Sequence, residues 1–224
     1  MKASVIRATA FRALKPRLFE PIIPLKLIEG LKEKYSFHQV PNVIDQSATS
    51  APAMFHLGEL KKGDHVIEVE QLLIAYIGLE ATSIGVATRS STDDCDEFLE
   101  NLLDWAKETY KLDTTPIHPN AYHSALEAVL AKEIGRPFEQ LNLIGKAISS
   151  LLSAYGSKGS NFELTGFTMH IDLTKNPPPP IPTPFNIERR LGAKFEENKY
   201  FSQAPLKTGD HKAVLEQLEK ILLS

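Results

Sequence analysis

The sequence predicts an α+β fold of two layers, in which a mainly antiparallel sheet of about six strands carries helices packed on one face. Three observations support this prediction. Several segments alternate apolar and polar residues, and others space their apolar residues as helices do. The 224 residues are 42% hydrophobic and 24% charged, as in ordinary globular proteins. Because a chain of this length buries enough surface for one core, we expect a single domain spanning residues 1–224.

The first half of the chain is expected to supply most of the sheet. Its strand-like segments lie at residues 4–14, 53–60, 65–77 and 81–89. The last three are joined by short turns and predict an antiparallel meander. Arg7 and Arg12 are five residues apart in the first segment, so they should point to opposite faces of the sheet. A helix at 24–35, beginning with Pro24, is expected to pack against this sheet.

The strongest local signal is a helix start near residue 91. Ser90, Ser91 and Thr92 offer hydroxyl caps, and the acidic residues that follow complement the helix dipole. Further helices are predicted at residues 92–110, 121–134, 138–155 and 210–223. The helices at 24–35, at 92–110 and within 121–155 should cover one face of the sheet.

Two strands and a proline-rich segment are expected between the later helices. Alternation predicts strands at 167–173 and 185–191. The prolines between 177 and 184 exclude a sheet interior and predict an extended connector, which could also bind an aromatic groove of a partner. No internal repeat is visible in the sequence.

Charge and cysteine content narrow the classes of partner. The formal net charge of -3 arises from 25 basic and 28 acidic residues, which disfavours nucleic acid as a partner. The single cysteine, Cys95, has acidic neighbours that should raise its thiol pKa, and it excludes an intramolecular disulfide. We find no signal peptide and no apolar stretch of about 20 residues, so we expect a cytoplasmic protein that does not contact a membrane.

Metal ligands are the first class of candidate site residue. His118, His123 and His170 could serve a metal-dependent hydrolase or nuclease if the fold brought them together. Pro119 and Asn120 instead favour a helix entry at this point. The acidic residues between 93 and 97 could attract a hard cation, but helix capping explains them better because the spaced ligands of a calcium loop are missing.

Basic residues are the second class. Arg7, Arg12, Arg189 and Arg190 are the candidates for a nucleic-acid-binding module, provided that the two basic groupings meet on one surface. Strand alternation places some of them on opposite faces, and solvated charges at a sheet edge are the simpler interpretation.

Two stretches of the chain resemble a known family. The run from Thr88 to Asp94, followed by Phe98, Leu99 and Trp105, and the segment from Tyr200 through His211 resemble a sporadically distributed bacterial family of uncharacterised proteins. The resemblance implies a bacterial cytoplasmic protein. It implies no particular reaction and assigns no catalytic residue.

The leading functional prediction is a non-enzymatic interaction subunit of a bacterial assembly. The sequence has no nucleophile elbow, phosphate loop or dinucleotide fingerprint, so we assign no catalytic residue and no cofactor. The expected partner is another protein or a second copy of the chain, in a hetero-complex or homo-oligomer. Metal-dependent hydrolysis and nucleic-acid binding stay open as alternatives.

Overall fold

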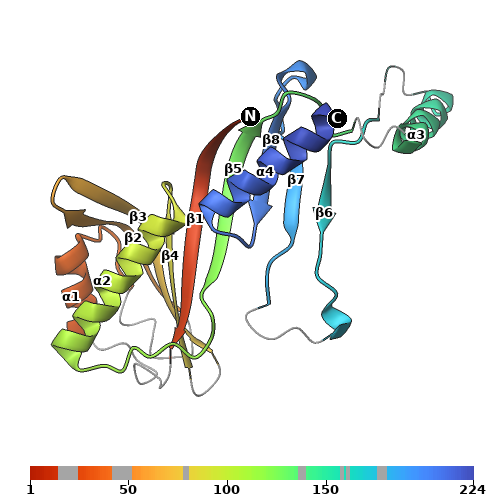
Figure 1. Ribbon diagram of the computed structural model, residues 1–224. Coiled ribbons are helices and arrows are strands. Elements are labelled where there is room, and N and C mark those ends of the chain that lie inside the picture. The colour runs from red at the N-terminus through yellow and green to blue at the C-terminus, as the bar shows by residue number, and fades with distance from the viewer. Residues whose placement is uncertain are drawn as a thin grey trace.

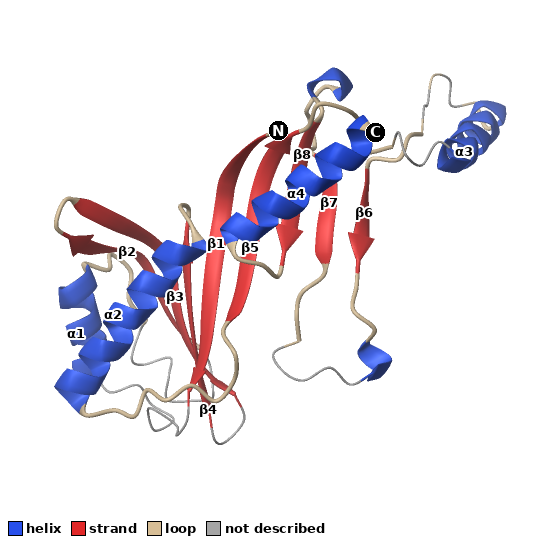
Figure 2. Ribbon diagram, viewed as in Figure 1, coloured by secondary structure: helices blue, strands red, loops and turns tan. Residues whose placement is uncertain are grey.

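The described chain forms one antiparallel sheet with helices on one of its faces. The computed structural model describes residues 1–14, 25–41, 52–77, 81–135, 140–156, 159, 162–175 and 181–224. Eight strands are hydrogen-bonded in the order β2-β3-β4-β1-β5-β8-β7-β6. Helices α1, α2 and α4 lie across the same face of this sheet (Figure 2). The predicted α+β class and its one-sided helical layer are therefore confirmed, with eight strands in place of about six.

The elements of the first half lie close to their predicted positions. They are β1 (Lys2–Leu14), α1 (Leu25–Tyr35), β2 (Ala53–Lys62), β3 (His65–Ile77), β4 (Ala81–Thr88) and α2 (Thr92–Tyr110). Ser91 is extended, with φ -154°, and its hydroxyl accepts a 3.1 Å hydrogen bond from the Asp94 amide. This contact confirms the predicted hydroxyl cap of α2.

The elements of the second half differ more from prediction. They are β5 (Ala121–Val129), α3 (Asn142–Ala154), β6 (Gly166–Met169), the short 3₁₀ turn η3 (Leu173–Lys175), β7 (Phe185–Arg189), a second such turn η4 (Phe195–Glu197), β8 (Lys199–Ala204) and α4 (Thr208–Leu223). The strand predicted at 167–173 ends at Met169, and the proline-rich connector is described only from residue 181 onward.

The helix predicted at 121–134 is wrong, because this segment is strand β5. It pairs with β1 from Lys2↔Val129 to Phe11↔Ala121 and with β8 on its other side. Ser124, Leu126 and Ala128 alternate toward the helices, so the segment is buried as the central strand of a sheet. The helix entry predicted at Pro119 and Asn120 therefore leads into a strand.

Strand β8 was not expected from the sequence at all. Tyr200, Ser202 and Ala204 are buried on one face, and the strand lies between β5 and β7. The last helix, α4, begins at Thr208, and its Ile221 is 60% exposed.

The two halves of the chain repeat one topology, although no repeat is visible in the sequence. Each half runs strand, helix, three strands, helix, and the two sets of strands are mirrored about the β1–β5 pair. At this seam the Thr92 amide donates to the Thr208 hydroxyl at 3.0 Å, and the Thr208 amide donates to the Thr92 hydroxyl at 2.9 Å. These residues are 116 positions apart. The same offset relates buried Cys95 to buried His211, where unlike side chains hide the repeat.

Each half has its own hydrophobic core beneath its helices. In the first half, α1 and α2 cover β1 to β4, and the Tyr35 and Phe98 rings lie 4.7 Å apart between the two helices. In the second half, α4 covers β5, β7 and β8, and Leu126, Ile187 and Leu215 are fully buried there. No helix within the described ranges combines the length and apolar character needed to cross a membrane.

Candidate functional site

The four arginines predicted as a nucleic-acid site are divided between the two faces of the sheet. Arg7 lies on the face without helices, whereas Arg12 lies on the helical face and is bonded to Asp96, as the five-residue spacing predicts. Arg189 donates to the Phe195 carbonyl at 2.8 Å. Arg190 lies 3.5 Å from a Glu127 carboxylate oxygen. These arginines therefore form no common basic patch on one face.

The three histidines predicted as metal ligands do not come together in one cluster. His118 lies in the connection before β5, His123 lies on β5, and His170 follows β6. None of them joins a group of three or more possible ligands within the described part of the chain. Burial, and then the charge of Arg7, lower the pKa of His123 below its usual value.

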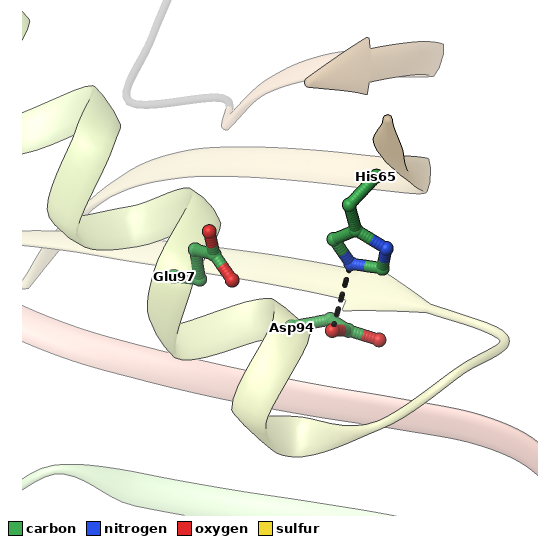
Figure 3. Close-up of side chains that lie close together, drawn as sticks. All are labelled: His65, Asp94 and Glu97. Atoms are coloured by element: carbon green, nitrogen blue, oxygen red, sulfur yellow. Dashed lines mark ion pairs between the residues drawn. The ribbon is translucent and has the colours of Figure 1, made fainter. Parts of the chain in front are cut away.

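One other group of possible metal ligands does come together, at the start of α2. His65, Asp94 and Glu97 place one ligand atom each within 4.8 Å of one another (Figure 3). His65 Nε2 lies 3.5 Å from Asp94 Oδ1, while the Lys62 ammonium contacts Glu97 at 2.7 Å. The Lys62 ammonium already neutralises the Glu97 carboxylate. This partly exposed group is therefore better explained as an electrostatic contact between the β2–β3 hairpin and α2 than as a cation site.

A charged network joins the two halves at their seam. Asp96 of α2 accepts hydrogen bonds from Arg12 of β1, from the Tyr122 hydroxyl of β5 at 3.0 Å, and from Lys207 before α4 at 2.9 Å. Burial opposes ionisation, but hydrogen bonds from Lys207 and Arg12 outweigh it and lower the pKa of Asp96. The carboxylate is thus held ionised between two cations. Three donors from three different segments hold this carboxylate in place, which supports a structural role.

His211 forms a second polar contact, within the second half. Its Nδ1 lies 2.8 Å from Ser124 Oγ, and its Nε2 lies 2.8 Å from Ser202 Oγ. Ser–His contacts of this length occur in nucleophilic enzymes. Here all three side chains are fully buried, so a substrate cannot reach either hydroxyl. Burial, followed by the charge of His123, lowers the pKa of His211 to about 4.

The open face of the sheet carries a shallow groove across the seam. Its volume is about 450 Å³, and it is lined by Ile6, Arg7, Thr9, Phe11, Gln71, Leu73, Gly85, Val86, Ala87, His123, Ala125, Thr183, Phe201 and Gln203. Arg7 donates to Gln71 Oε1 at 2.7 Å on its floor. The Phe11 ring lies over Gly85, where any β-carbon would clash with it. Since five strands contribute, no single stretch of sequence predicts this groove.

Helix α3 has the most unusual surface of the described chain, because it exposes a group of large apolar side chains. The sequence predicts a helix here, with its apolar residues packed on the sheet. The helix exists, but it lies beyond the β6 edge, away from the sheet (Figure 1). The large apolar side chains that it exposes, to extents between 36% and 77%, are Leu143, Ile144, Ile148 and Leu151, together with Tyr155 at its C-cap. Four of these five follow helical spacing and form one stripe.

Comparison with known proteins gives this chain no family. No family model matches it, and no curated protein matches it significantly. The resemblance to the sporadically distributed bacterial family therefore stays a prediction.

Proposed function

We propose that the protein is a non-enzymatic interaction subunit of a bacterial cytoplasmic assembly, and that α3 is its main contact element. The observation that carries the proposal is the exposed apolar stripe of α3. Monomeric soluble proteins rarely display a contiguous group of large apolar side chains unless it contacts another molecule. The stripe runs along the helix through Ile144, Ile148, Leu151 and Tyr155.

The shape of the helix supports a protein partner. An amphipathic helix that lays its apolar side into a groove or onto a sheet is a common mode of protein recognition. Burying one exposed Leu or Ile side chain contributes up to about 2 kcal/mol. Four or five such side chains approach about 10 kcal/mol, which is comparable to the cost of association. We therefore expect a reversible assembly in which α3 supplies most of the binding free energy.

The reactive side chains of the described residues support the same proposal. The Ser124–His211–Ser202 contact is enclosed, and Asp96 accepts from three donors, two of which are cations. The groove on the open face places Arg7 and His123 among mostly apolar or amide neighbours. This groove is better suited to contact a partner surface than to perform acid–base chemistry.

The proposal is tested by charging the apolar stripe. A double variant, Ile144→Glu with Leu151→Glu, should abolish assembly measured by light scattering on a sizing column and by affinity capture in the native host. Lys146→Glu, on the same helix, and Leu191→Glu, a fully exposed apolar residue elsewhere, are matched controls that should assemble normally. Circular dichroism verifies that each variant folds.

Two results would contradict the proposal. One is a wild-type protein of 24.9 kDa that stays monomeric at every concentration and captures nothing that the double variant does not also capture. The other is an assembly that the double variant leaves intact. Capture of an unidentified protein supports the proposal only if the double variant loses it and both controls keep it.

A further inference from the structure

The repeated topology shows where a helix such as α3 packs. In the first half the equivalent helix, α1, lies beside α2 on the sheet, with Leu31 and Tyr35 buried. The Tyr35 ring contacts Trp105 of α2 at 6.2 Å. Leu102 of α2 is only 3% exposed in this cluster. The α1 helix thus covers one flank of α2 as well as the sheet.

The corresponding flank of α4 is uncovered. The 116-residue offset that relates Thr92 to Thr208 places Leu218 at the position of Leu102 and Ile221 at that of Trp105. Leu218 is only partly buried, and Ile221 is 60% exposed. The second half therefore keeps the apolar side chains that would receive a helix and lacks the helix.

The sheet beside this flank offers apolar side chains as well. Met169 of β6 pairs in register with Phe185 of β7, so both lie on one face. The Phe185 ring lies 6.1 Å from that of His211, which identifies this face as the one that carries α4. Met169 is 62% exposed, and Phe185 is half-buried. We call the surface of Met169, Phe185, Val214, Leu218 and Ile221 the acceptor face.

We propose that the acceptor face of each molecule receives α3 of a second copy, so that two chains exchange this helix about a two-fold axis. The inference rests on the proposed function and names its partner. A closed two-fold exchange covers both α3 stripes and both acceptor faces with the same contact, which is the usual route to a homodimer. Because α3 lies beyond the β6 edge of its own sheet, it is already directed outward (Figure 1).

The two apolar surfaces match in pattern. The buried residues of α1 recur at spacings of three and four, and the stripe of α3 has the same spacing over a helix of similar length, 13 residues against 11. On α4, Val214, Leu218 and Ile221 also follow each other at four and three positions. Helices with such ridges pack side by side with their side chains interleaved.

Cysteine cross-linking between copies tests the exchange. Ile148→Cys and Leu218→Cys are prepared as separate single variants and mixed in equal amounts before mild oxidation. A disulfide between residues 148 and 218 can then form only between copies, and it doubles the mass of 24.9 kDa on a non-reducing gel. Peptide mapping verifies the linked pair. The natural Cys95 is buried and does not interfere.

The expected result is the 148–218 disulfide between copies and a dimeric mass for the wild type that Ile221→Glu reduces to the monomer. A double variant, Ile148→Cys with Leu218→Cys, that cross-links only within one chain would overturn the exchange, because α3 then covers its own acceptor face. Absence of any 148–218 disulfide would overturn it too. If the α3 double variant nevertheless loses a different partner protein, the interaction subunit proposal stands while the exchange fails.

Discussion

Acidification should destabilise this protein mainly through His211. The side chain is fully buried between Ser124 and Ser202, and its pKa is lowered from 6.5 to about 4. In the unfolded chain the imidazole returns to its ordinary pKa, so the unfolded state binds the proton more readily. The free energy of unfolding therefore falls as the pH drops below the unfolded pKa, and the loss is complete below the folded pKa.

The size of this loss follows from the pKa difference. Each unit corresponds to about 1.4 kcal/mol, so the complete loss is about 3.5 kcal/mol, of which about 3 kcal/mol is reached by about pH 4. By about pH 5 the loss is about 2 kcal/mol relative to about pH 7.5. His123, whose pKa is also lowered, adds a loss of the same sign. Carboxylates with lowered pKa, such as Asp96, contribute mainly at more acidic pH.

Urea unfolding at a series of pH values measures the effect. His211→Gln keeps one donor and one acceptor for the two serines but cannot titrate, so the difference between wild type and this variant should shrink by about 2 kcal/mol between about pH 7.5 and about pH 5. His170→Gln, at an exposed position after β6, is the control and should follow the wild type. A wild type minus His211→Gln difference that is constant over this range would refute the reasoning.

Two further predictions concern Asp96 and Cys95, on the side of α2 that faces the sheet. Asp96→Asn should lower the free energy of unfolding by about 3 kcal/mol in urea, because Arg12 and Lys207 are left as close cations without their counter-charge. Asp93→Asn, at a side chain that is 78% exposed, should cost no more than about 0.5 kcal/mol, and equal effects of the two variants would contradict the network. Burial raises the pKa of the Cys95 thiol to about 11, so the native protein should not react with a thiol reagent at neutral pH. One equivalent should react in denaturant, and rapid reaction of the native protein would show that the thiol is accessible.

The sequence predicts best those elements whose signals are local. Helix α2 is correct because its hydroxyl cap, acidic first turn and apolar rows all lie within residues 91–110. The raised thiol pKa of Cys95 was also predicted, although burial is the largest cause and the acidic neighbours are a smaller one. The meander of β2, β3 and β4 is equally local, since strands that follow one another in the chain pair with each other.

Elements that depend on distant partners were missed. Strand β5 resembles a helix by spacing alone, and its pairing with β1, more than a hundred residues earlier, decides its conformation. The apolar stripe of α3 predicts a helix but cannot show whether its partner lies in the same chain or in another. The acceptor face combines β6, β7 and α4, so each contributing segment looks like an ordinary part of a core.

The β1–β5 ladder has a consequence for cooperativity. Strand β1 lies at the edge of the first core and β5 at the edge of the second, and the two strands are hydrogen-bonded to each other. Opening either core would break that shared row of hydrogen bonds and separate Thr92 from Thr208, which leaves two helix termini without their acceptors. We therefore expect the two halves to unfold together, in a single transition.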